Sequence, residues 1–286
     1  MSSTAPRPRA VNKTKRTAKT SPSKAKNATN DVEAVVASLK RLGTKRTLDG
    51  MARYAIPSDN AFGVSVGEIR QLGKRLGHNH ELALGLWQTG FYEARMLAAF
   101  VDDPESVTPA QMDRWCKDFD NWAICDTVCF HLFDKTPHAF RKVAHWADRR
   151  NEFEKRAAFA LLASLGVHDK KASDSEFARC LPLIERASTD ERNFVKKGVS
   201  WALRVVGRRS PELNEASVKL SEKLTKSDNA AARWIGRDAL KELTGKAVIG
   251  RLKQRSRIAQ NKGKESNHSS IIIGHLSIIN SMNAFE

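Results

Sequence analysis

One segment of the sequence combines three positive charges with an indole ring at helical spacing. The four residues follow the i, i+4, i+7, i+11 pattern of one helix face. They are Lys197, Trp201, Arg204 and Arg208. Surfaces that bind nucleic acid combine cations, which contact phosphates, with aromatic rings, on which bases or sugars pack. The stripe therefore favours nucleic-acid binding, although a basic stripe also fits a solvated helix face.

A second segment places an aromatic ring next to a carboxylate. Trp122 and Asp126 are four residues apart, so on a helix their side chains would stand side by side. Which face of this helix meets the core is left open, because two apolar stripes run along it. One contains Ile124 and Val128, and the other contains Cys125 and Cys129. Spacing alone also fits a packed core tryptophan and a solvated aspartate.

Arg156 is a third candidate, near the start of a predicted helix. A helix N-terminus does not favour cations, so an arginine at this position suggests a role beyond local helix stability. The alternative is a surface arginine paired with Glu152, four residues earlier.

Motifs for cofactors and metals are not found. Cys125 and Cys129 are four residues apart, which is not the spacing of a zinc knuckle, and no second pair follows. An improvised site with Cys116 and His131 is a weak alternative. The sequence has no phosphate-binding glycine loop, no His-Glu-x-x-His and no Gly-x-Ser-x-Gly. We expect no metal and no cofactor.

The elements that position these residues are predicted to be helices throughout. Val32, Val35, Val36 and Leu39 form one amphipathic stripe that ends near Gly43. Helix-start patterns recur at Ser65, Thr108, Ser173, Ser188 and Ser210. Helical segments are also predicted from Leu82 and over Tyr92–Val101, and no period-2 strand pattern appears between 31 and 258. The spacing fits helical hairpins of about 35–45 residues, typical of HEAT-type repeats, whose stacking creates a concave surface.

The positive charge is concentrated near the ends of the chain. The net charge is +17, with eight Lys and Arg in residues 1–30 and seven in residues 246–264, and neither stretch contains an acid. Residues 1–30 are too poor in apolar side chains to form a core, so they are predicted to be a disordered basic tail. Such a tail fits a DNA tether or nuclear-targeting arm, or alternatively an organellar transit peptide. Residues 31–258 are predicted to form the folded domain, and residues 259–286 a poorly structured C-terminal tail.

The composition also predicts an intracellular protein, which we expect to be a monomer. No run of 18 apolar residues is present, so no membrane span is expected. The four cysteines are few for the length and fit a reducing compartment. The expected location is the nucleus in a eukaryote, with an organelle as the alternative, or the cytoplasm and nucleoid in a bacterium.

Four segments, in order along the chain, resemble the AlkD-type alkylpurine DNA glycosylases, also called DNA alkylation repair enzymes. The first runs from Gly50 through Tyr54 to Ser65, and Ile69–Lys74 continues it. Trp122 and Asp126 match the family's Trp-x-x-x-Asp, and Arg156 lies in a matching Lys-Arg-Ala-Ala-Phe context. Residues 197–204 resemble the family's Lys-x-x-x-Trp-Ala-Leu-Arg. The resemblance covers about residues 32 to 245.

The resemblance implies an all-α, HEAT-like superhelix that binds duplex DNA in its concave groove. It implies hydrolysis of the N-glycosidic bond of cationic N3- or N7-alkylated purines, without flipping the base. In that reading Asp126, Trp122 and Trp201 stabilise the oxocarbenium character of the sugar. Arg156, Arg204, Lys197 and Tyr54 would contact the DNA.

Two other functions fit the same scaffold. One is a non-catalytic, structure-selective DNA-binding protein. The other is a HEAT-type scaffold for protein interactions, localised by its basic tails. A scaffold has no need of a carboxylate between two indoles, so the combination of Trp122, Asp126, Arg156 and Trp201 favours the glycosylase.

Overall fold

The computed structural model describes residues 22–257, and this part of the chain is helical and contains no strand. The α-helices are α1 (Pro22–Leu42), α2 (Lys45–Met51), α3 (Val66–Leu76), α4 (His80–Gln88), α5 (Tyr92–Val101), α6 (Pro109–Lys117), α7 (Trp122–His131), α8 (Ala139–Trp146), α9 (Glu152–His168), α10 (Asp174–Ala178), α11 (Leu181–Ala187), α12 (Asn193–Val206), α13 (Pro211–Thr225) and α14 (Ala230–Leu243). Two short 3-10 helices are η1 (Ala52–Tyr54) and η2 (Phe133–Lys135), and residues 246–257 form a last helix. The all-α prediction is confirmed.

Local capping chemistry decides most helix starts. Ser65 begins α3 with a complete capping box, in which its side chain accepts from the backbone N–H of Glu68 and Glu68 reaches back. Thr108 accepts from the backbone N–H of Gln111 at the start of α6, where Pro109 takes the first helical position. The prediction at Ser188 is wrong: its hydroxyl donates to the Glu185 carbonyl at the end of α11, and the next helix begins only at Asn193.

The first helix is longer than the sequence predicts. It begins at Pro22 instead of near Asp31, so its first turns fall within the segment predicted as a disordered tail. Proline is compatible with the first position of a helix, because its missing N–H would be unpaired there. The rest of the tail, residues 1–21, and the C-terminal tail from 258, with its Ile271–Ile273 run, lie outside the described residues.

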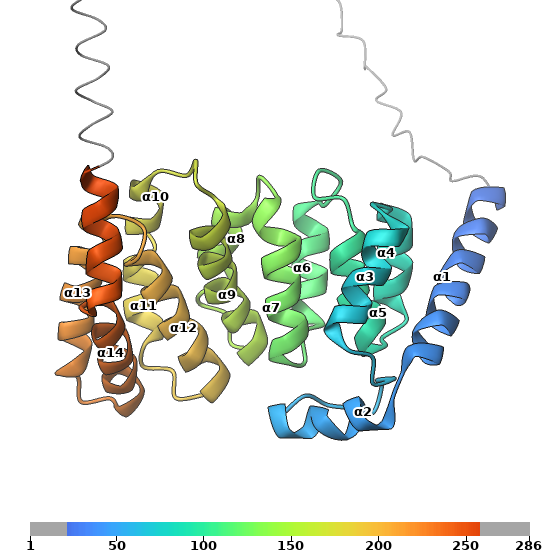
Figure 1. The fold of residues 1–286 in the computed structure, drawn as a ribbon, viewed down its shortest axis with the longest axis horizontal. Coiled ribbons are helices and arrows are strands. Elements are labelled where there is room, and N and C mark those ends of the chain that lie inside the picture. The colour runs from blue at the N-terminus through green and yellow to red at the C-terminus, as the bar shows by residue number, and fades with distance from the viewer. Residues whose placement is uncertain (1–21, 258–286) are drawn as a thin grey trace, which may run out of the picture.

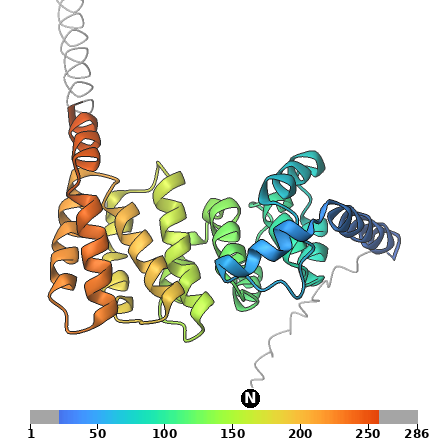
Figure 2. The same ribbon diagram turned by 60° about the horizontal axis from the view of Figure 1, so that its bottom comes forward.

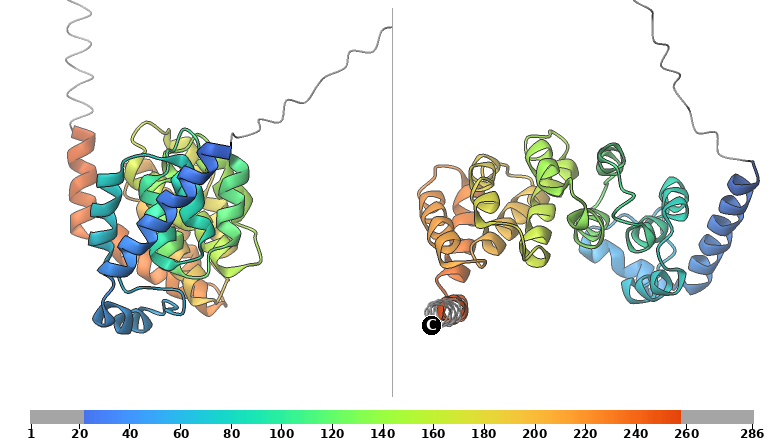
Figure 3. Two further views of the ribbon diagram at one scale, coloured as in Figure 1. Left: turned by 90° about the vertical axis from the view of Figure 1, so that its right-hand side faces the viewer. Right: turned by 90° about the horizontal axis from the view of Figure 1, so that it is seen from above.

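The helices form two layers that follow the long axis of the molecule (Figures 1 and 2). One layer is a continuous series in which each helix packs on the next: α3, α5, α7, α9, α12 and α14. Helices α4, α8 and α13 pair with members of this series from the other layer. The path of the array is curved when seen from above, in the right-hand view of Figure 3. Helix α2 lies across the direction of the other helices, below them in Figure 1.

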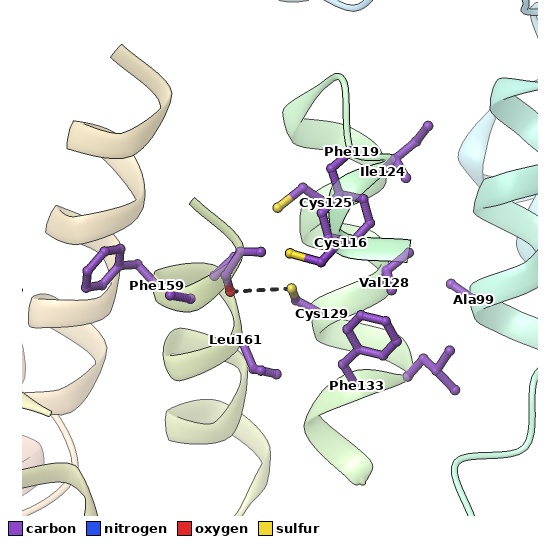
Figure 4. Close-up of a cluster of buried hydrophobic side chains, with 14 of the residues drawn as sticks. Ala99, Cys116, Phe119, Ile124, Cys125, Val128, Cys129, Phe133, Phe159 and Leu161 are labelled. Atoms are coloured by element: carbon purple, nitrogen blue, oxygen red, sulfur yellow. Dashed lines mark hydrogen bonds between the residues drawn. The ribbon is translucent and has the colours of Figure 1, made fainter. Parts of the chain in front are cut away.

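The core is densest around α7 and α9. Both apolar stripes of α7 are buried, because α5 packs on one side of the helix and α9 on the other. Figure 4 shows Cys116, Cys125 and Cys129 within this core, where the Cys129 thiol points to the backbone carbonyl of Ala157, 3.6 Å away. Burial raises the pKa of the Cys129 thiol well above its ordinary value, so this cysteine acts as a small apolar side chain.

No described helix has the length and apolarity needed to cross a membrane. Within residues 22–257, no group of three or more His, Cys, Asp or Glu side chains is arranged to hold a metal ion.

Candidate functional site

A cleft of about 550 Å³ opens where three helices of one layer meet the segment after α2. The helices are α7, α9 and α12, and the segment is η1 with the residue that follows it. The residues that line the cleft are Arg53, Tyr54, Ala55, Trp122, Asp126, Arg156, Asn193, Phe194, Lys197 and Trp201. The structure thus brings together six of the seven predicted site residues, and Arg204 is the exception.

Trp122 and Asp126 reach the cleft because Asn121 begins α7. The Asn121 side chain accepts from the backbone N–H of Ile124 and fixes Trp122 as the first helical residue. Asp126 follows one turn later on the same face. The indole N–H of Trp122 donates to the backbone carbonyl of Tyr54, 2.7 Å away. This hydrogen bond connects the N-terminal part of the chain to the middle of the array.

The segment that receives this bond ends in an unusual backbone conformation. Ala55 has φ of 52°, in the left-handed region that glycine normally occupies. The N–H of Ile56 donates to the Met51 carbonyl and the N–H of Ala55 donates to the Ala52 carbonyl, as in a Schellman motif. The turn leaves Tyr54 66% exposed at the edge of the cleft. A non-glycine residue in this conformation stores strain of about 1–2 kcal/mol.

Arg156 forms a bidentate ion pair with Asp126. Its Nε donates to Oδ1 of Asp126 at 2.9 Å, and one terminal nitrogen donates to Oδ2 at 2.6 Å. The other terminal nitrogen donates to the backbone carbonyl of Phe194 at 2.7 Å. The Arg156 side chain is 8% exposed, whereas the Asp126 side chain is 21% exposed. The guanidinium is therefore held inside the protein, and the carboxylate is the member of the pair that faces the cleft.

Burial and the ion pair act in opposite directions on Asp126. Desolvation raises the pKa of its carboxyl above the ordinary value, and the adjacent positive charge of Arg156 opposes that rise. The two hydrogen bonds from Arg156 also favour the ionised form. Among the described residues, Arg156 supplies both the charge and the hydrogen bonds that offset the cost of burying Asp126.

The N-terminal ends of α9 and α12 are fixed to each other beside this pair. The Glu152 side chain accepts from the backbone N–H of Phe194 at 3.2 Å. Asp190, in the loop before α12, binds both Lys155 and Arg192, at 2.9 and 2.6 Å. Hydrogen bonds from Arg192 hold the pKa of Asp190 well below its ordinary value, and they outweigh partial burial, which raises it. These contacts place Phe194 and Lys197 at the cleft.

The two halves of the basic stripe on α12 lie in different environments. Lys197 and Trp201, in the first half of the helix, line the cleft. Arg204 instead donates to Glu242 of α14 at 2.7 Å, and Arg208 binds the same carboxylate at 2.9 Å. Arg204 does not line the cleft, because carboxylates of α14 hold its guanidinium, and its contact with DNA stays a prediction.

Several features of the cleft were not predicted. The alternative pairing of Arg156 with Glu152 is wrong, since Glu152 binds the Phe194 backbone and Arg156 binds Asp126. Arg53, Ala55, Asn193 and Phe194 were not proposed as site residues. Asn193 stands at i−4 from Lys197, so the helical stripe could have been extended to it.

Comparison with known proteins identifies the family. The family model described as DNA alkylation repair enzyme matches residues 35–243, and no curated protein gives a significant match. A solved structure of a protein related to the HEAT-like repeat DNA glycosylases, with affinity for branched DNA structures, superposes with a TM-score of 0.61. It is 22% identical, and the alignment covers 72% of this chain and 93% of that one. The predicted HEAT-like fold and the predicted resemblance are confirmed. The chain belongs to the DNA alkylation repair enzyme family.

Proposed function

We propose that the protein is a DNA glycosylase that hydrolyses the N-glycosidic bond of cationic N3- or N7-alkylated purines in duplex DNA. Its family and its fold, related to the HEAT-like DNA glycosylases, support a role in DNA repair. The observation that carries the catalytic part is the cleft in which one carboxylate, Asp126, faces outward with Trp122 and Trp201 among the lining residues.

The chemistry suits these side chains. An alkylated purine with a positive charge is already a good leaving group, so no general acid is needed to protonate it. As the C1′–N bond breaks, its electron pair returns to the purine and positive charge develops on the sugar. Asp126 supplies the countercharge and orients the water that attacks C1′. The electron-rich faces of Trp122 and Trp201 pack on the deoxyribose and share in stabilising its positive charge. The products are the free base and an abasic site.

The remaining cleft residues would hold the DNA. Lys197 and Arg53 bring positive charge to the cleft, and Lys197 and exposed Tyr54 are assigned to contact the backbone of the duplex. Arg156 contributes chiefly by orienting Asp126 and keeping it ionised, because three of its nitrogens already donate within the protein. The resemblance further suggests that Arg156 and Arg204 touch flanking phosphates and that the base stays unflipped. An intracellular location and a monomeric state are part of the same proposal.

The direct test is base release. Purified protein is incubated at low salt with methylated duplex DNA, and free 7-methylguanine and 3-methyladenine are measured by chromatography, with unmethylated duplex as the control. Release of either base above the rate seen without protein supports the proposal. No release from DNA that the protein demonstrably binds would contradict it.

A second candidate is a non-catalytic protein that binds particular DNA structures. It is favoured by the similarity to a protein with affinity for branched DNA. The cleft argues against it, because a binding module has no use for a partly desolvated carboxylate held by a buried arginine. Binding of a four-way junction in preference to duplex, together with no base release, would establish this second function.

A further inference from the structure

A second pocket, of about 410 Å³, lies at the opposite end of α9 and α12 from the cleft. The cleft is lined by residues of the first half of α12, whereas this pocket is lined by residues at the C-terminal ends of α9 and α12 and by the helix 246–257. Its charged lining residues are Lys170, Asp174, Arg208, Arg209, Arg251 and Arg255. We call it the basic pocket.

Positive charge in the basic pocket exceeds what its own carboxylates neutralise. Arg208 pairs with Glu242, and Arg209 lies 3.8 Å from Asp174. Lys170, Arg251 and Arg255 form no ion pair with any residue in the described range 22–257. A concave pocket with unneutralised cations is a site for an anion.

The last helix is fixed to the array in a way that presents its arginines to the pocket. Val248 and Leu252 are buried, at i and i+4, and so anchor one face of the helix. Arg255 donates to the backbone carbonyls of Arg208 and Arg209, at 3.1 and 2.9 Å. Arg251 also lines the pocket, and its hydrogen bond within residues 22–257 is to Ala247 of its own helix. The family model ends at residue 243, so this helix lies beyond the matched part of the chain.

Arg209 lines the basic pocket and is held in place by several contacts. Its guanidinium lies 3.8 Å from the ring centroid of Phe177 and donates to the backbone carbonyls of Gly166, Asp169 and Ala172. Its Nε is buried and has no hydrogen-bond acceptor within the part of the chain that the structure describes. Burial and the positive charges of Arg209 and Arg255 lower the pKa of Lys170. A bound anion would relieve this repulsion.

The simplest structural account is that these cations cap the C-terminal carbonyls of α9 and α12. That account explains Arg209 and Arg255, which donate to such carbonyls, and Lys170, which donates to the Val167 carbonyl. Arg208 in turn pairs with Glu242. Neither contact explains Arg251, which lines the pocket and whose hydrogen bond is to its own helix.

We propose that the basic pocket binds a phosphodiester of the DNA backbone, as a second phosphate site away from the cleft. α12 has 14 residues and therefore spans about 21 Å at 1.5 Å per residue. That length corresponds to roughly six base-pair steps of 3.4 Å, so the separation of the two places along α12 is within the length of a short duplex. The inference rests on the DNA-binding part of the proposed function and is independent of its catalytic part.

The test compares two matched double variants of the full chain. Lys170→Gln/Arg251→Gln removes two charges from the basic pocket, at exposed side chains whose hydrogen bonds in the structure are local. Lys171→Gln/Lys253→Gln removes two exposed charges from the same loop and the same helix, but neither residue lines the basic pocket or the cleft. Thermal unfolding verifies that both variants fold. Affinity for a fluorescent 25-base-pair duplex is then measured against salt concentration.

The pocket variant is expected to bind more weakly at low salt, and the slope of log K against log salt should fall in magnitude by about one, since the loss of one phosphate contact removes about 0.9. The control variant should keep the wild-type slope. Equal slopes in the two variants would overturn the proposal. Titration with inorganic phosphate distinguishes a site for free phosphate from a site for the DNA backbone. If the pocket variant loses phosphate binding but keeps its affinity for DNA, the proposal is also overturned. Base release at saturating substrate should be equal in both variants.

Discussion

Asp126 and Arg156, 30 residues apart in the sequence, meet through two hydrogen bonds of 2.9 and 2.6 Å. The guanidinium is buried and its third nitrogen donor binds the Phe194 carbonyl, so α7, α9 and α12 are connected through one side chain. The pair explains how a carboxylate can stay ionised in a partly desolvated cleft. It also makes the pKa of the Asp126 carboxyl depend on Arg156.

Replacing Arg156 should change the pH dependence of base release. In Arg156→Gln, burial of Asp126 is no longer opposed by a positive charge, so the pKa of its carboxyl rises further above the ordinary value. The acid limb of the kcat profile should therefore move to higher pH. The free energy of unfolding should fall by about 3–5 kcal/mol, as is typical when one partner of a buried ion pair is removed.

Arg156→Lys is the matched variant, because it keeps the charge and loses the bidentate geometry. Its acid limb should lie between those of the wild type and Arg156→Gln. An acid limb that stays in place in Arg156→Gln would show that Asp126 does not depend on this arginine.

Glu93 is expected to stabilise the loop that leads into α3. It is fully buried, and its carboxylate accepts from the backbone N–H groups of Phe62, Gly63 and Val64, at 2.7 to 3.2 Å. Glu93→Gln places an amide donor where acceptors are needed and should lower the free energy of unfolding by about 2 kcal/mol. Urea unfolding measures this, with exposed Glu81→Gln as the control. A change no larger than in the control would contradict the assigned role.

Stability should fall in mild acid because of His131. Burial, reinforced by the nearby charges of Arg70 and Lys135, lowers the pKa of His131 from 6.5 to about 4. Because its folded pKa lies below its unfolded value, protonation favours the unfolded chain, and stability is lost as pH falls from about 6.5 to about 4. Allowing for partial exposure, the loss is about 1–2 kcal/mol. His131→Phe should lack this part of the acid sensitivity, measured as thermal unfolding at pH 7 and pH 4.5. Equal losses in both proteins would exclude His131 as the cause.

Gly198 offers a stabilising substitution next to the site. A Cβ atom at this position would lie 3.5 Å from the Arg156 Cγ and 3.6 Å from the Phe159 Cβ, which is ordinary packing distance. Since Gly198 is in the interior of α12, Gly198→Ala should raise the free energy of unfolding by about 0.5–1 kcal/mol. Gly236→Ala is the contrasting variant, because its Cβ would lie 2.7 Å from the Ser221 carbonyl oxygen. A lower stability of Gly198→Ala than of the wild type would contradict the claim that a methyl group fits beside Arg156.

The sequence predicts those helix boundaries that are fixed by contacts between residues close together along the chain. Thr108 and Ser65 act on N–H groups three residues later, and both helix starts are confirmed. Ser188 fits the same pattern, yet its hydroxyl ends α11, because one short motif cannot show whether a helix lies before or after it. Contacts between side chains that are far apart in the sequence could not be predicted either. The Trp122 bond to Tyr54 joins residues 68 apart, and the α14 carboxylates that hold Arg204 follow from packing alone.

The central claim is that Asp126 stabilises the positive charge that develops on the sugar. The most direct test is single-turnover release of 7-methylguanine from methylated duplex by Asp126→Asn, with DNA affinity measured in parallel and exposed Asp148→Asn as the control. We predict a rate at least about a hundredfold below wild type with little change in affinity, and a wild-type rate for Asp148→Asn. Release at the wild-type rate by Asp126→Asn would contradict the account.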